Sequence, residues 1–227
     1  MRDTLLFDLD GTLTDTDPLH FEAYARLLGP HGKAVDHATY KARIMGNTNE
    51  AIMTWLFPEA DAAARKALAD RKEALFREIA GTSMVRARGL TELLDWAAAL
   101  KLKTAVVTNA PRANAELMLG ALGLATRFDA LVIGDELPRG KPDPLPYARA
   151  LEILGAAPAR AMAFEDSASG VRSATGAGVD TVGLMTGLAK EQLTGAGAVG
   201  AVPDFADPWL STRLRAEYGS APLPLAA

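Results

Sequence analysis

Short apolar runs without polar alternation recur along the chain, and each is followed by a polar or glycine position and then by a stretch with helical periodicity. These runs occupy residues 5–9, 104–107, 130–133, 161–164 and 181–184. Runs of this kind suit strands that are covered on both faces, and their alternation with helices is typical of βα units. The pattern therefore predicts an α/β fold whose core is a doubly wound, Rossmann-like parallel sheet.

The stretches between these runs predict the helices that cover the sheet. We expect helices at residues 90–100, 112–122, 144–154 and 167–176. Gly123, Gly155 and Gly178 lie near the ends of these stretches. Glycine is favoured there because it adopts the left-handed backbone conformation that often ends a helix.

The βα alternation stops between Asp15 and about Gly81, where the pattern predicts only helices. We expect these at residues 18–28, 37–44, 47–57 and 60–79. The sequence therefore predicts an all-helical cap domain at residues 15–83, inserted into an α/β core domain of residues 1–14 and 84–227. An insertion after the first strand leaves from the edge where open α/β sheets bind ligands, so we expect it to act as a lid.

Composition narrows the class of protein and of partner. The chain has 227 residues, of which 49% are hydrophobic, and this is enough for a full core. With 24 Lys and Arg against 28 Asp and Glu, the net charge of −4 predicts no binding to nucleic acid or to an anionic membrane. Cysteine is absent, which excludes disulfides and thiolate metal sites. The acidic start and the lack of an apolar run of about 18 residues predict a cytoplasmic protein without a membrane span.

Polar side chains are concentrated where the predicted strands end. The clusters are Asp8-Leu9-Asp10-Gly11, Thr108-Asn109, Gly140-Lys141 and Glu165-Asp166. Because the carboxyl ends of parallel strands converge on one crevice, we expect these side chains to meet. Four acidic groups and one lysine gathered there would repel strongly, so either some carboxyls stay protonated or a divalent cation is bound. A hard cation with oxygen ligands, such as Mg²⁺, is the simpler answer.

Each cluster also has a structural alternative. Asp8 and Asp10 could be strand-end carboxylates that loop amides satisfy, although two such groups on an apolar strand are costly without a task. Lys141 could be a solvated loop lysine, and Thr108 could only end a strand or cap a helix. The acidic pair after the fourth run could only charge the N-terminus of the next helix. The chemical interpretation is favoured because all the clusters share one edge of the sheet.

The ordered set of motifs resembles that of the haloacid dehalogenase superfamily, in the branch of phosphoglycolate phosphatase and β-phosphoglucomutase. The resemblance covers nearly the whole chain and includes the place of the helical cap. It implies a Mg²⁺-dependent phosphatase that hydrolyses a small phosphorylated metabolite, of the phosphoglycolate or sugar phosphate type, through an aspartyl-phosphate on Asp8. Asp10 separates the chain from relatives that cleave carbon–halogen or carbon–phosphorus bonds, which depart at this position.

The resemblance also implies a role for each motif residue. Asp8 would be the nucleophile and Asp10 the general acid and base, while Thr108 would donate to the phosphate and Lys141 would neutralise its charge. The implied magnesium ligands are Asp8, Asp10 through its backbone carbonyl, Asp166, and Glu165 either directly or as a partner of a ligand.

Further residues are candidates for contact with the substrate. They are His20, Gly46, Asn49, Lys72, Asn109 and Arg112. For His20 and Lys72, ordinary positions on a helix surface are an equal alternative. In the mutases of this branch an Arg holds the second phosphate at the position of Asn49, and Asn cannot replace a bidentate cation. This favours transfer to water, with a sugar-phosphate mutase or a non-catalytic phosphate-binding regulatory protein as the alternatives. The sequence leaves the oligomeric state open.

Overall fold

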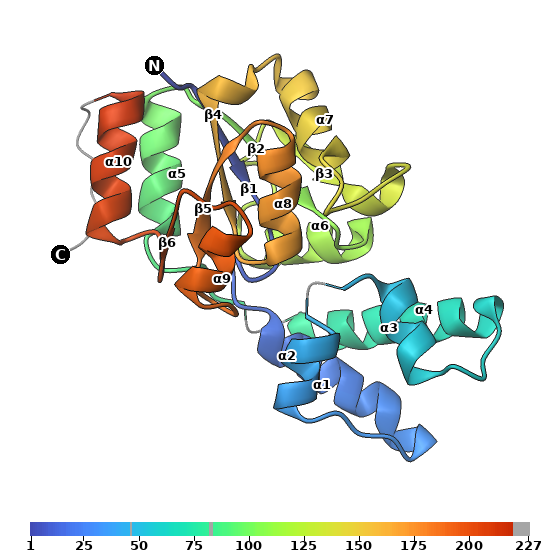
Figure 1. Ribbon diagram of the computed structural model, residues 1–227. Coiled ribbons are helices and arrows are strands. Elements are labelled where there is room, and N and C mark those ends of the chain that lie inside the picture. Colours follow the sequence, from blue (N-terminus) through green and yellow to red (C-terminus); the bar gives the residue numbers. More distant parts are fainter. Residues whose placement is uncertain (46, 82–83, 220–227) are drawn as a thin grey trace. The chain divides into compact units, whose positions relative to one another are not determined.

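The computed structural model describes residues 1–45, 47–81 and 84–219, and the chain separates into two compact units. The first unit contains Met1–Asp15 and Val85–Ala227, and the second contains Thr16–Met84 (Figure 1). The chain therefore leaves the first unit shortly after its first strand and returns to it before its first long helix.

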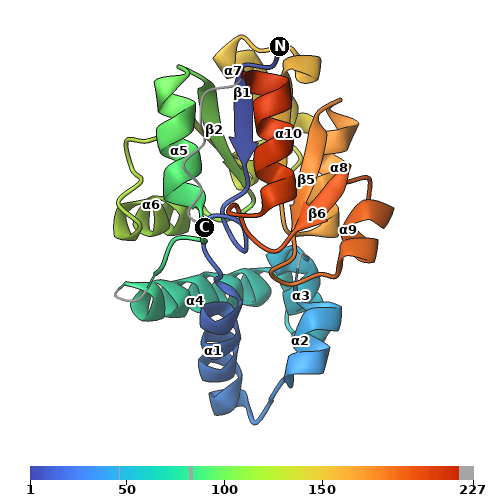
Figure 2. The ribbon, with the colours of Figure 1, turned by 90° about the vertical axis from the view of Figure 1, so that its left-hand side faces the viewer.

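Among the residues that the structure describes, a six-stranded parallel sheet forms the centre of the first unit (Figure 2). Its strands lie in the order β3-β2-β1-β4-β5-β6. Their bounds are Thr4–Phe7 (β1), Lys103–Thr108 (β2), Ala130–Ile133 (β3), Ala161–Glu165 (β4), Asp180–Leu184 (β5) and Gly200–Val202 (β6). The order reverses at β1, which confirms the predicted doubly wound sheet and places β1 at the switch point where such sheets bind ligands. The sequence pattern did not predict β6.

Helices cover both faces of this sheet, as predicted. The predicted ones are α5 (Leu90–Ala99), α6 (Arg112–Ala121), α7 (Leu145–Leu154) and α8 (Ala168–Gly176). The sequence pattern did not predict α9 (Lys190–Gly195), α10 (Pro208–Tyr218) or the 3₁₀ helices η2 (Gly134–Glu136) and η3 (Pro158–Arg160). Figure 1 shows α5 and α10 on one face and α7 and α8 on the other. Ser167 starts α8 by accepting a hydrogen bond from the backbone N–H of Gly170.

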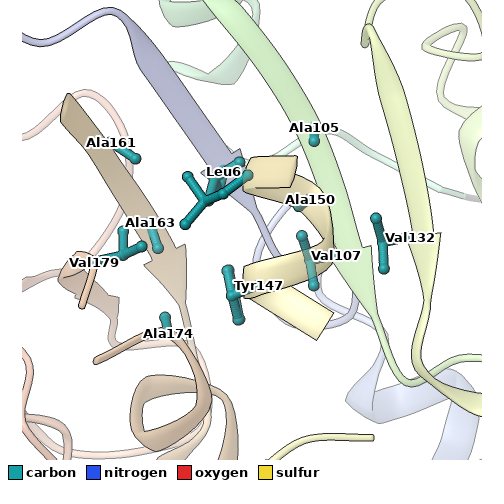
Figure 3. Packing of buried hydrophobic residues seen from close by; sticks show 11 residues of the cluster. Leu6, Ala105, Val107, Val132, Tyr147, Ala150, Ala161, Ala163, Ala174 and Val179 are labelled. Carbon is teal, nitrogen blue, oxygen red and sulfur yellow. The ribbon is translucent and has the colours of Figure 1, made fainter. Parts of the chain in front are cut away.

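The two faces of the sheet are packed differently. Leu6 belongs to a cluster in which small strand residues let α7 approach closely, and Figure 3 shows Tyr147 and Ala150 of α7 over Leu6 and Val107. The next residue, Phe7, is also fully buried, and its ring stacks on Phe164 with centroids 5.1 Å apart. Burial of each such side chain contributes about 1.5–3 kcal/mol, so β1 is firmly anchored on both sides.

The second unit is helical, as predicted. Its helices are α1 (Asp17–Leu28), α2 (His37–Arg43), α3 (Asn49–Leu56) and α4 (Ala62–Ala80), with a 3₁₀ turn η1 at Gly29–His31. The side chains of Asp36, Thr48 and Asp61 accept hydrogen bonds from backbone N–H groups and so fix where α2, α3 and α4 begin. Within residues 1–45, 47–81 and 84–219, every helix is too short or too polar to cross a bilayer.

Candidate active site at the carboxyl edge of the sheet

The register of the central strands brings three of the predicted motifs to one edge. Phe7 pairs with Val106 of β2 and with Phe164 of β4, so Asp8, the residue after β1, lies level with the ends of both neighbours. The backbone N–H of Asp8 donates to the carbonyl of Phe164 at 3.0 Å. Asp8 and Glu165 are therefore fixed on adjacent strands.

Lys141 joins these two carboxylates. It comes from the loop between η2 and α7, and its Nζ donates to Asp8 Oδ1 at 2.6 Å and to Glu165 Oε1 at 2.5 Å. Lys141 is only 5% exposed, which excludes the alternative of a solvated loop lysine. Burial lowers the pKa of Lys141, but Asp8 and Glu165 outweigh burial and raise this pKa above its ordinary value. Lys141 is therefore an ammonium ion at neutral pH.

For Asp8, in contrast to Lys141, burial outweighs the attraction of the opposite charge and favours the neutral form. Burial raises the pKa of Asp8 from 3.8 to about 8; Lys141 opposes this rise, whereas the charges of Glu165 and Asp10 add to it. One ammonium group does not compensate several buried carboxylates. The site therefore favours either a retained proton or a further cation.

The carboxylates also fit a metal ion. Among the described residues, Asp8, Glu165 and Asp166 are buried and each offers an oxygen within 4.8 Å of the others. A Cβ at Gly11, whose φ is +72°, would lie 2.1 Å from Asp166 Oδ2, so only glycine lets the turn after β1 approach this carboxylate. Three hard oxygen donors in one cradle suit Mg²⁺. The carbonyl of Asp10 is not part of this carboxylate set, and its role as a ligand stays a prediction.

Thr108 ends β2 at the same edge of the sheet. Its Oγ1 accepts a hydrogen bond from the backbone N–H of Ala110 at 2.9 Å. This bond orients the hydroxyl group and leaves its proton for another acceptor, which is what a phosphate-binding threonine requires.

Asn109 and Arg112 already have protein partners. The side chain of Asn109 forms two hydrogen bonds with the backbone of Lys141. Arg112 is exposed at the start of α6, where its Nε and Nη2 donate to Glu136 at 2.6 and 2.7 Å. Their predicted contacts with the substrate stay predictions.

The candidates of the second unit gather in one polar cluster inside that unit. Lys72 Nζ donates to His20 Nδ1 at 2.8 Å and to Glu73 Oε1 at 3.1 Å, and Asn49 Nδ2 donates to the same oxygen at 2.9 Å. Lys72 is 4% exposed, so it is not a solvated surface lysine. Gly46 lies outside the described residues.

Two contributors to these clusters were not predicted from the sequence. Tyr147 Oη donates to Glu165 Oε1 at 2.6 Å, and Lys141 Nζ lies 5.2 Å from the centroid of the Tyr147 ring. Glu73 is the acceptor that joins Lys72 and Asn49. The signal that could have identified Tyr147 is its place on the buried face of α7, because a buried tyrosine hydroxyl needs a partner.

Known proteins resemble this chain in sequence and in fold. Residues 2–178 match the family of haloacid dehalogenase-like hydrolases. A phosphorylated carbohydrates phosphatase from Thermotoga maritima is 33% identical over 185 residues, which cover 79% of this chain and 83% of that protein. Validoxylamine A 7'-phosphate phosphatase from Streptomyces hygroscopicus subsp. limoneus is 34% identical over 195 residues, which cover 82% of this chain and 87% of that protein. The structure of CbbY from Rhodobacter sphaeroides in complex with phosphate is similar with a TM-score of 0.81 at 26% identity, covering 91% of this chain and 96% of that one.

Proposed function

Because the chain belongs to the haloacid dehalogenase-like hydrolase family, we propose that it is a Mg²⁺-dependent phosphatase that forms an aspartyl-phosphate on Asp8. The observation that carries this proposal is the buried pair of Asp8 and Lys141, whose Oδ1 and Nζ lie 2.6 Å apart beside the acidic triad. A buried carboxylate can attack phosphorus, and a fixed ammonium group stabilises the charge of the phosphoryl oxygens. The names of the two relatives support a small, sugar-like phosphate as the substrate.

The first half-reaction transfers the phosphoryl group to the protein. Asp8 Oδ2 forms a bond to phosphorus while the bond from phosphorus to the leaving oxygen breaks, and Lys141 holds Oδ1 in place. Asp10 gives its proton to the departing alkoxide, so that the leaving group departs as an alcohol. The hydroxyl of Thr108 donates to a phosphoryl oxygen.

The second half-reaction returns Asp8 to its starting state. The carboxylate of Asp10 takes a proton from a water molecule as that water attacks phosphorus. The bond between phosphorus and Asp8 then breaks, and inorganic phosphate leaves. One acid–base residue serves both steps because the first step leaves it in the form that the second requires.

Asp8, Glu165 and Asp166 would hold the Mg²⁺ ion, together with the backbone carbonyl of Asp10. When bound, the ion supplies positive charge that stabilises the negative charge of the phosphoryl oxygens. Burial is the chief cause of the raised pKa of Asp8. The nucleophile must nevertheless be ionised at neutral pH, and this supports the need for a cation beside it.

Water is the acceptor that we propose for the phosphoryl group, rather than a second site on a sugar phosphate. Asn49 donates its amide to Glu73, so this position offers an already bonded neutral group instead of a guanidinium fork. A second phosphate therefore lacks the bidentate partner that a mutase of this branch would provide.

The proposal is tested by hydrolysis of p-nitrophenyl phosphate with and without Mg²⁺. Asp8→Asn should abolish turnover, because an amide is a poor nucleophile at phosphorus, and acid-quenched wild type should carry phosphate on Asp8. Asp70→Asn makes the same chemical change at an exposed residue of α4 and should retain full activity. Full activity in Asp8→Asn, or label on another residue, contradicts the proposal. The substrate class is then tested by kcat/KM on sugar monophosphates, phosphoglycolate and a sugar bisphosphate.

A further inference from the structure

The position of Lys141 depends on a loop rather than on a strand or helix. Residues 137–144 connect η2 to α7, and Lys141 lies within this segment. A lysine side chain has about 2 kcal/mol of rotamer entropy even before the motion of its backbone is counted. The two short contacts of its ammonium group with Asp8 and Glu165 therefore require that the backbone of Lys141 be fixed by something else.

Asn109 provides this fixation from the end of β2. Its Oδ1 accepts a hydrogen bond from the backbone N–H of Lys141 at 3.0 Å, and its Nδ2 donates to the carbonyl of the same residue at 3.1 Å. Both backbone polar groups of Lys141 are thus held by one side chain. This pairing needs a group that both accepts and donates, as a carboxamide does and a carboxylate does not.

Two glycines enclose the carboxamide. A Cβ at Gly134 would lie 2.2 Å from Asn109 Oδ1, and a Cβ at Gly140 would lie 2.8 Å from the same atom. Neither glycine has a φ in the left-handed region, so backbone conformation does not require glycine at these positions. The close approach of the Asn109 side chain does. The loop is closely packed around this side chain.

We propose that Asn109 is a positioning residue that holds the backbone of Lys141 against the end of β2, so that the ammonium group reaches Asp8 and Glu165. This inference rests on the proposed function of Lys141 in phosphoryl transfer. This role differs from the expected contact of Asn109 with the substrate, because here the oxygen and the nitrogen of the amide are both bonded to the loop. Since Asn109 directly follows Thr108, the end of one strand places both the phosphate-binding hydroxyl and the lysine.

The kinetic test separates positioning from substrate binding. Asn109→Ala should lower kcat by about tenfold to a hundredfold, as expected when a charged group is displaced by about 1 Å, and should change KM by less than about threefold. In a Lys141→Ala background, Asn109→Ala should cause no further loss, because a residue that acts through Lys141 has nothing left to position. Gln192→Ala is the matched control, since its amide accepts from a backbone N–H at α9 and its loss should leave kcat unchanged.

A structural measurement tests the inference independently of activity. Hydrogen exchange of the Lys141 amide should be at least about tenfold faster in Asn109→Ala than in wild type, while the amide of Leu137, bonded to the Gly134 carbonyl, should change much less. If Asn109→Ala does not fold, Gly140→Ala replaces it, because the added Cβ must displace the Asn109 amide.

The outcomes distinguish the two proposals. A raised KM with unchanged kcat, losses that multiply in the double variant, or unchanged exchange at Lys141 overturns the positioning role. Full activity of Lys141→Ala, or absence of turnover in wild type, overturns the proposed function instead. In that case the exchange measurement still decides whether Asn109 holds the Lys141 backbone.

Discussion

Glu165 Oε1 receives hydrogen bonds from two donors at once, the ammonium group of Lys141 and the hydroxyl of Tyr147. Burial raises the pKa of Tyr147 well above its ordinary value, so its hydroxyl remains a donor at every pH at which the protein would be assayed. The phenol compensates part of the charge of Glu165. Because of this, Lys141 can remain shared between Glu165 and Asp8.

The substitution Tyr147→Phe removes this donor and leaves the ring in place. It should destabilise the protein by about 1.5–3 kcal/mol, the usual contribution of a hydrogen bond to a charged group. It should also lower kcat by about tenfold, because the Lys141 ammonium shifts from Asp8 toward Glu165. The measurements are urea unfolding and steady-state kinetics.

Tyr218→Phe is the control for this prediction. The Tyr218 hydroxyl is also buried, but it donates to the neutral backbone carbonyl of Thr4 at 2.7 Å, far along β1 from Asp8. Its loss should cost about 0.5–1.5 kcal/mol and leave kcat unchanged. Equal kinetic effects of the two variants would falsify the role assigned to Tyr147.

Part of the site could be predicted from the sequence because it depends on topology alone. Asp8 follows β1 and Glu165 ends the adjacent parallel strand β4, so the doubly wound sheet brings both to one edge. The partners of Tyr147 and Asn109 could not be predicted in this way. The first depends on how α7 is rotated on the sheet, and the second depends on how a loop folds around an amide.

At the scale of secondary structure, the predicted helices of the first unit were confirmed with ends shifted by a residue or so. The α7 helix begins at Leu145 rather than at 144 and ends before Gly155, whose φ is +57°. The β6 strand was missed because it has 3 residues, and its Gly200–Val202 segment is too short for a periodic signal. Local pattern therefore predicts long elements better than a short edge strand, which tertiary pairing defines.

Two of the ion pairs within the α4 helix lie in contrasting environments, and they give a prediction for the second unit. Lys72 and Glu73 are buried, with 3.1 Å between Nζ and Oε1, whereas Lys66 and Asp70 are exposed, with 2.7 Å between Nζ and Oδ2. Glu73→Gln leaves a buried ammonium group without its counter-charge and should cost about 3 kcal/mol. Asp70→Asn removes an exposed partner and should cost less than about 0.5 kcal/mol. Thermal unfolding of both variants checks the difference.

The difference in stability between wild type and Glu73→Gln should change with pH in one direction. Burial raises the pKa of Glu73, but the charges of Lys72 and His20, with the hydrogen bond from Asn49, outweigh burial and hold this pKa below its ordinary value of 4.5. A carboxyl whose pKa is lowered by folding stabilises the protein above 4.5 and loses this contribution as the pH falls through the lowered value. The advantage of wild type over Glu73→Gln should therefore be complete at pH 7 and shrink below about pH 4.5. An advantage that grows in acid would contradict the pairing.

At the scale of the whole molecule, the sequence predicted the parallel sheet because strands covered on both faces are apolar without polar alternation. The central place of β1 comes from the structure, because an apolar pattern carries no information on strand order. The helical unit, Thr16–Met84, was recognisable by the loss of that pattern. Its action as a lid stays a prediction. Lys72 and His20 were candidates for contact with the substrate, with an ordinary position on a helix as an equal alternative. Periodicity carries no information on the hydrogen bond that they form within their own unit.

The last prediction concerns the linkage between Mg²⁺, protons and the stability of the whole fold. Burial raises the pKa of Asp8 from 3.8 to about 8 in the metal-free protein, so between these values the folded protein holds a proton that the unfolded chain has lost. Stability of the metal-free protein should therefore fall as the pH rises from 6 to 8, by at most about 1.4 kcal/mol per pH unit for one proton.

Binding of Mg²⁺ requires the carboxylate form and displaces this proton, so the stabilisation by Mg²⁺ should increase over the same range. The measurement is the Tm in EDTA and in saturating Mg²⁺ at pH 6, 7 and 8. The gain in Tm should be largest at pH 8 in wild type. In Asp8→Asn the gain should be small and independent of pH, because the titrating ligand is absent. A gain in wild type that is constant or that decreases with pH would mean that Mg²⁺ does not compete with a proton on Asp8, and that the acidic triad does not hold the metal as proposed.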